Sequence, residues 1–165
     1  MLENGLTYTS TRTVEEHHLA SHVGSGDLRV LSTPSMIALM EEASMLCVAP
    51  HLSEGQTTVG GHISASHLKP TAHGRNITAT ATLTAVEGRK LQFSVTASDE
   101  AGIIGEGEHT RFIVDREKFM SRLGQLPSIV NVRRPHKLLS DLRERFVAPA
   151  TESGRTNEKM PQKLT

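Results

Sequence analysis

The sequence predicts an α+β fold in which one long helix packs against an antiparallel sheet. The stretch from Met36 to Val48 has apolar side chains on nearly every side, which is typical of a buried helix. Residues 75–86 and 91–98 alternate apolar and polar side chains, which is typical of strands with one buried face. The turns that separate the predicted strands lie at 70–74, 87–89 and 99–102.

The predicted elements follow one another in order along the chain. A Thr-rich first strand spans residues 6–20, and a loop that contains Gly24-Ser25-Gly26-Asp27 spans 21–32. Ser32-Thr33-Pro34 supplies a helix cap and a proline at the first helical position, and Pro50 ends the helix. The remaining predictions are strands at 58–69, 75–86, 91–98 and 103–114 and a short helix at 116–123.

Composition limits the function classes. Among the 165 residues, 18 basic and 18 acidic residues cancel, which gives no electrostatic case for a nucleic-acid or membrane partner. The single cysteine, Cys47, excludes an intramolecular disulfide and is expected to pack in the core. No apolar run approaches the roughly 20 residues of a membrane span, and residues 1–10 lack the features of a signal peptide. We expect a cytoplasmic protein with no metal site and no cofactor.

A single sheet wrapped around one helix, the hotdog fold, is the economical arrangement of these elements. Such a sheet leaves edge strands, and a second copy that pairs edge to edge would cover one of them. We therefore expect a homodimer, with further assembly open. The hotdog domain is expected to span 1–123. Residues 124–165 form a basic tail with eight Lys/Arg against four Asp/Glu, expected to be disordered or partly helical around 136–147.

The predicted strand at 58–69 carries a candidate general base. By strand alternation His67 shares a face with Val59, Ile63 and Ala65, so it is expected to point toward the core, whereas His62 is expected at the surface. An inward imidazole is either a core residue satisfied by a carbonyl or a general base. The sequence leaves these two interpretations open.

The helix and the start of the same strand carry further candidates. Glu41 and Glu42 interrupt the apolar helix. Either both face water at a groove, or one is a buried carboxylate with a functional role, and periodicity does not choose between the two residues. Gly60 and Gly61 accommodate a bulge, or they aim a backbone N–H at a carbonyl oxygen. Thr33 either caps the helix or presents its hydroxyl to a ligand.

The order of these residues resembles the fluoroacetyl-CoA thioesterase-like branch of the hotdog superfamily. The resemblance covers about residues 5–122, and its matching stretches are Ala38–Glu41, Val59–His67, Val86–Arg89 and Val114–Phe119. The resemblance implies a homodimer that hydrolyses acyl-CoA thioesters, with Thr33, Glu41 and His67 as the catalytic triad and Gly60 beside the thioester carbonyl. It thereby selects Glu41 over Glu42 and associates it with His67.

Two points narrow this hypothesis. Thr33 and Glu41 are eight residues apart, about 12 Å along a helix, so a substrate bridges them or a partner subunit supplies one. The family's fluoroacetyl-specific enzyme has aromatic residues in the loop before the threonine, whereas Gly24–Leu28 has none, so a broader or different acyl group is expected.

Lys69 and Arg75 are candidates for binding the CoA phosphates. The alternatives are a non-catalytic acyl-CoA-binding hotdog protein and a hotdog hydratase or dehydratase.

Overall fold

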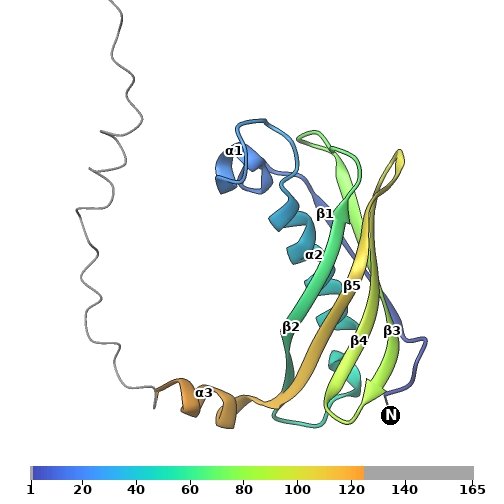
Figure 1. Cartoon of the computed structure of the whole chain (residues 1–165), viewed down its shortest axis with the longest axis vertical. Helices are drawn as coiled ribbons and strands as arrows, with labels where there is room; N and C mark the ends of the chain where they lie inside the picture. Colours follow the sequence, from blue (N-terminus) through green and yellow to red (C-terminus); the bar gives the residue numbers. More distant parts are fainter. Residues whose placement is uncertain (1, 125–165) are drawn as a thin grey trace, which may run out of the picture. The chain divides into compact units, whose positions relative to one another are not determined.

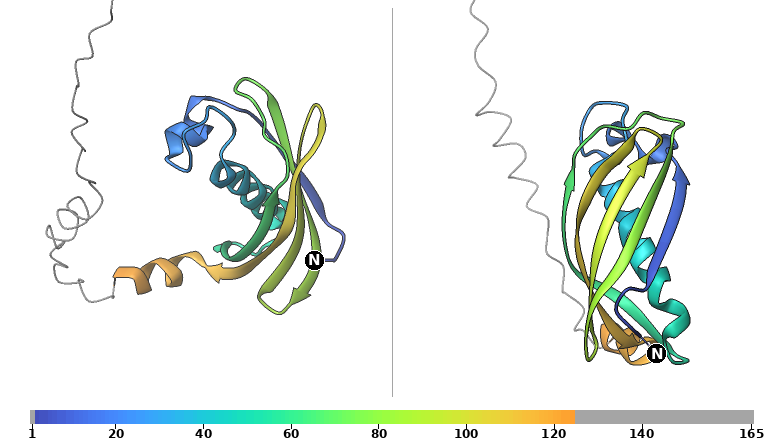
Figure 2. Two further views of the ribbon diagram at one scale, coloured as in Figure 1. Left: turned by 45° about the horizontal axis from the view of Figure 1, so that its top comes forward. Right: turned by 90° about the vertical axis from the view of Figure 1, so that its right-hand side faces the viewer.

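The computed structural model describes residues 2–124 and confirms the predicted hotdog fold. Five antiparallel strands form one sheet in the order β1-β3-β4-β5-β2, and helix α2 lies along its concave face (Figure 1 and Figure 2). The strands are β1 (Thr7–Thr13), β2 (Gln56–His67), β3 (Asn76–Glu87), β4 (Lys90–Asp99) and β5 (Gly102–Asp115). The helices are α1 (Ala20–Val23), α2 (Thr33–Val48) and α3 (Arg116–Gly124). None of the described helices is long and apolar enough to span a membrane.

Local signals fix both ends of α2. The Ser32 side chain accepts a hydrogen bond from the Ser35 N–H at 3.1 Å, and Pro34 occupies the first turn. A 3₁₀ turn that contains Pro50, Ala49–His51, follows the helix. Thr33 is therefore not the cap, and its hydroxyl is available for another contact.

The core lies between α2 and the inner face of the sheet. The predicted inward residues of β3 and β4 are buried except Ala85, which is half-buried and follows the register shift after Leu83. Cys47 is buried in the same core, as expected. Phe93 is the largest of these side chains. Because the rest of the core is aliphatic, the helix and the sheet pack through Ile, Leu, Val, Met and Ala side chains.

Strand β2 contains a one-residue bulge that changes which side chains face α2. Its register with β5 shifts between Gly60 and His62, so Gly61 is the extra residue. Thr58 pairs with the buried Ile113 before the bulge, and Ile63 pairs with the buried His109 after it. The prediction that Val59 shares the inner face with Ile63 and His67 is therefore wrong, because the bulge reverses the alternation between them.

The predicted first strand is too long. Strand β1 ends at Thr13, and a 3₁₀ turn at Glu16–His18 and helix α1 replace its second half and part of the predicted loop. The Glu15 N–H donates to the Nδ1 atom of His18 at 3.0 Å, so a side chain satisfies the backbone locally and competes with the strand ladder. The predicted tail beyond residue 124, including its helix at 136–147, lies outside the described residues.

Candidate functional site

Thr33 and His67 form the first polar pair of the site. The Thr33 Oγ1 and the His67 Nδ1 share a hydrogen bond of 3.0 Å that joins the start of α2 to the end of β2. Burial lowers the pKa of His67, so its imidazole is neutral at neutral pH. The His67 Nε2 is buried and has no hydrogen-bond partner within residues 2–124. A neutral, inward-facing imidazole has the chemistry of a general base.

A cavity of about 370 Å³ adjoins this pair. It is lined by Ala20, Ser25, Val30, Leu31, Ser32, Thr33, His67, Leu68, Lys69 and Pro70. Lys69, predicted as a phosphate partner, is thus close to the Thr33–His67 pair. Arg75, the other predicted partner, is exposed in the turn before β3 and is not among the lining residues.

Glu41 and Gly60 form a second polar group, and Glu41 lies eight residues after Thr33 in α2. The Glu41 side chain is 41% exposed, and its Oε1 lies over the Gly60 backbone. A Cβ atom at Gly60 would come within 2.7 Å of that oxygen, so only glycine leaves room for the carboxylate there. Gly61 serves the opposite face, where an added Cβ would collide with the ring of Phe112.

The two adjacent glutamates, which periodicity did not distinguish, face different strands. Glu42 forms an ion pair with Arg12 of β1. Glu41 faces β2 and β5, and its Oε1 lies 3.6 Å from the Nε2 of His109. Within the described chain the imidazole beside Glu41 is thus that of His109, whereas His67 lies with Thr33.

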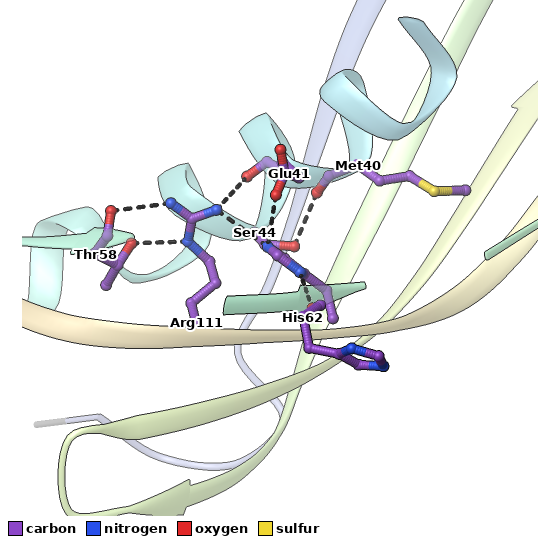
Figure 3. Close-up of polar contacts among 7 residues, drawn as sticks. Met40, Glu41, Ser44, Thr58, His62 and Arg111 are labelled. Atoms are coloured by element: carbon purple, nitrogen blue, oxygen red, sulfur yellow. Dashed lines mark hydrogen bonds and ion pairs between the residues drawn. The ribbon is translucent and has the colours of Figure 1, made fainter. Parts of the chain in front are cut away.

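His109 and Arg111 of β5 are buried polar residues that the sequence analysis did not identify. They are 1% and 6% exposed. The Arg111 Nε donates to the Thr58 Oγ1 at 2.9 Å, and its Nη2 donates to the Thr58 carbonyl at 3.0 Å (Figure 3). The Arg111 Nη1 lies 3.1 Å from the His109 Nε2 and 3.5 Å from the carbonyl oxygen of Glu41. Their alternation with the apolar Ile113 in β5 was the available signal that both point inward.

The electrostatics of this group follow from burial. Burial lowers the pKa of His109 and also that of Arg111, although the charge of Glu41 opposes the second shift. A guanidinium remains charged despite such a shift, whereas a buried imidazole becomes neutral. The group therefore combines a cation, a neutral imidazole and a half-exposed carboxylate.

Comparisons with known proteins agree with this architecture. The family model described as fluoroacetyl-CoA-specific thioesterase matches residues 14–117. The fluoroacetyl-CoA thioesterase of Streptantibioticus cattleyicolor is 38% identical over 96 residues, which cover 58% of this chain and 69% of that protein.

Solved structures of fluoroacetyl-CoA thioesterase variants superpose on the chain. One, in complex with fluoroacetate and CoA, shares 33% identity with a TM-score of 0.68 and covers 72% of this chain and 99% of its own. Another, in complex with acetyl-CoA, shares 32% identity with a TM-score of 0.72 and covers 75% and 98%. The chain belongs to the fluoroacetyl-CoA-specific thioesterase family, a family of acyl-CoA thioester hydrolases.

Proposed function

We propose that this protein hydrolyses a small or medium acyl-CoA thioester to the free acid and CoA at a dimer interface. Thr33, Glu41 and His67 are the proposed catalytic residues, with the thioester carbonyl beside Gly60. The observation that carries the proposal is the presence of two separate polar pairs, Thr33–His67 and Glu41–Gly60, on one helix and one edge strand. Each pair contains only part of the proposed catalytic site. Relatives that bind fluoroacetate, CoA and acetyl-CoA support the substrate class.

A homodimer offers a way to complete the site. Gly60 and His67 are seven residues apart on β2, which is about 23 Å of strand. Strand β2 is at the edge of the sheet, so its outer side is available to a second β2. In an antiparallel pair related by a twofold axis, the His67 end of one strand lies beside the Gly60 end of the other. Each proposed site then combines Thr33–His67 of one protomer with Glu41–Gly60 of its partner.

The chemistry follows from these groups. A backbone N–H of Gly60 or Gly61 stabilises the oxyanion that forms as the thioester carbonyl is attacked. Glu41 attacks that carbonyl or activates the water that does. His67 removes a proton from water or gives one to the departing CoA thiolate, and Thr33 orients the imidazole through its 3.0 Å hydrogen bond.

The cavity beside Thr33 supports an acyl group broader than fluoroacetyl. Its walls include Ser25, Val30 and Leu31, and the adjoining loop has no aromatic side chain. Lys69 at the cavity remains a candidate for the CoA phosphates, and exposed Arg75 is a weaker one. The cytoplasmic location remains a prediction from the sequence.

A panel of acyl-CoA thioesters with free thiol as the readout tests this function. We expect thiol release by the wild type and a loss of at least a hundredfold in kcat for Glu41→Ala and for His67→Ala, since each removes a reacting group. Glu42→Ala is the matched control because it removes a neighbouring carboxylate that pairs with Arg12 instead.

Other outcomes would identify the alternatives. Wild-type rates in both Glu41→Ala and His67→Ala would contradict the proposed triad. Thermal stabilisation by acyl-CoA without thiol release would indicate a non-catalytic binding protein. Loss or gain of enoyl-CoA absorbance without thiol release would indicate a hydratase or dehydratase.

A further inference from the structure

A second cavity in the described chain gathers positive charge away from Thr33 and His67. It has a volume of about 310 Å³ and lies where α3 meets the start of β2 and the end of β5. This cavity, which we call the α3 pocket, is lined by three cations, a carboxylate, an amide and an aromatic ring: Arg89, Lys118, Arg122, Asp115, Gln56 and Phe119. The mechanism above uses none of these side chains.

The charge of the α3 pocket contrasts with that of the domain. Residues 1–123 contain ten Lys/Arg and fourteen Asp/Glu, so the domain as a whole is acidic. Three of the ten cations nevertheless line this one pocket, against a single carboxylate. Lys118 and Arg122 are four residues apart on α3, where like charges repel and destabilise a helix. An anion bound between these cations would offset the repulsion.

Residues 2–124 do not themselves supply that anion. Asp115, the carboxylate in the pocket, accepts the Lys118 N–H at 2.9 Å and so caps the first turn of α3. Within the described residues no ion pair joins Arg89, Lys118 or Arg122 to a carboxylate. Lys90, by contrast, pairs with Glu87 at 3.3 Å. The three cations of the α3 pocket are therefore available to an external ligand.

The lining of the α3 pocket indicates the chemical class of that ligand. Guanidinium groups match the oxygens of a phosphate with paired N–H donors. The Phe119 ring is 37% exposed and lies three residues from Arg122 on α3, so it offers an apolar face on which a nucleotide base can stack. A volume of about 310 Å³ also falls in the range of small-molecule sites, roughly 300–1,000 Å³. A phosphorylated nucleoside fits all three properties.

We infer that the α3 pocket binds the adenosine and phosphate groups of the acyl-CoA whose thioester lies beside Gly60. The inference rests on the proposed function and extends it to the other end of the substrate. Gln56 of the pocket precedes Gly60 by four residues in β2, which is about 13 Å of strand. The pantetheine arm of CoA is long enough to span that separation.

The proposed dimer places Lys69 on the same path. When His67 of one protomer lies beside Gly60 of the other, the residues after His67 run beside those before Gly60. Lys69 of one protomer and Gln56 of the other then lie on the same side of the shared site. Figures 1 and 2 show α3 extending past the β2 edge of the sheet. The phosphates are then bound between Lys69 of one protomer and the α3 pocket of the other.

Substrates with and without the nucleotide end test this inference kinetically. The double variant Arg89→Gln/Arg122→Gln is expected to raise KM for acyl-CoA by about tenfold and to leave kcat unchanged, because the nucleotide contacts are the same in the ground and transition states. For the matching acyl-pantetheine thioester, which lacks the nucleotide, the variant and the wild type are expected to have equal KM and kcat. An unchanged KM for acyl-CoA, or an equal rise in KM for both substrates, would overturn the inference.

Matched variants separate binding in the pocket from the loss of net charge. Lys90→Gln removes a positive charge next to Arg89 in the sequence, but Lys90 does not line the α3 pocket. It is expected to leave KM unchanged, whereas Arg89→Lys/Arg122→Lys is expected to raise KM for acyl-CoA less than the glutamine variant does. A rise in Lys90→Gln as large as that in Arg89→Gln would overturn the inference. Arg89 and Arg122 are exposed, so their variants are expected to keep the wild-type unfolding temperature.

Calorimetric titration with adenosine 3′,5′-bisphosphate decides the inference without turnover. The wild type is expected to bind this probe more weakly as ionic strength rises, and the double glutamine variant is expected to bind it about tenfold more weakly than the wild type. Equal affinities, or no binding by the wild type, would overturn the inference. Bound probe that acyl-CoA does not displace would also overturn it, because the pocket would then serve a separate nucleotide. A wild type that binds the probe through these arginines but releases no thiol would support the inference and overturn the proposed function.

Discussion

Gly60 and Gly61 are adjacent, but each lacks a side chain for a different reason. An added methyl group at Gly60 meets Glu41, whereas one at Gly61 meets Phe112 on the outer face of the sheet. Gly60→Ala is therefore expected to lower kcat on the order of a hundredfold by displacing the carboxylate. Gly61→Ala is expected to lower the unfolding temperature more than it lowers kcat. Steady-state kinetics together with thermal unfolding distinguish the two effects, and identical profiles would contradict this assignment.

The pKa of His67 sets the acid limb of the pH–rate profile. Burial lowers that pKa from the ordinary value of 6.5, so the neutral base form persists below pH 6.5. We expect kcat/KM to stay constant as pH falls to about 6.5 and to decline only at lower pH. A profile that already declines between pH 8 and 7 would contradict half-buried His67 as the base. Thr33→Val tests the Nδ1 hydrogen bond in the same assay.

At the residue scale the sequence predicted which side chains are candidates better than it predicted their neighbours. The helix pattern did not choose between Glu41 and Glu42, because the distinction depends on Arg12, which pairs with Glu42 from another element. His109 and Arg111 were missed because the hydroxyl that receives Arg111, Thr58, is 53 residues away in the sequence. Such partners follow from strand register, which side-chain periodicity does not encode.

At the scale of elements, the start of α2 separates structural from chemical roles in adjacent residues. Ser32→Ala removes the cap to the Ser35 N–H and is expected to cost about 1 kcal/mol of unfolding free energy. Thr33→Ala is expected to leave the unfolding free energy nearly unchanged and to lower kcat, because its hydroxyl contacts His67 instead. Urea unfolding and kinetics on both variants test this, and a larger stability loss in Thr33→Ala would contradict it.

The elements themselves were predictable where periodicity was strong. The alternation of β3 and β4 predicted their inner faces, and the apolar helix with its Pro34 start was found as expected. The first strand was overextended because the Glu15–His18 contacts that end it involve side chains, which a Thr-rich pattern does not reveal. The sequence allowed a bulge at the glycine pair, but it did not predict that the alternation of inward and outward side chains in β2 reverses there. A glycine pair is compatible with regular strand pairing too.

For the whole molecule, the proposed dimer makes a prediction that a single-chain site does not. Glu41→Ala and His67→Ala homodimers each lack one group at both sites. A heterodimer of the two variants would contain one complete site and one that lacks both groups. Unfolding and refolding an equimolar mixture is therefore expected to restore about a quarter of wild-type activity, since half of the dimers are mixed. No restoration in a mixture that has formed heterodimers would show that each site lies within one chain.

The bulge in β2 determines which of the strand's two histidines can take part in catalysis. Thr58 and Gly60 face the helix, so an uninterrupted strand would continue with His62, Ser64 and Ser66 on that side. The one extra residue, Gly61, exchanges that set for Ile63, Ala65 and His67. Regular pairing of the same residues, with Gly61 in the ladder, would thus direct His67 to solvent and bring His62 inward. In this chain the choice of the proposed base depends on the bulge as well as on the composition of the strand.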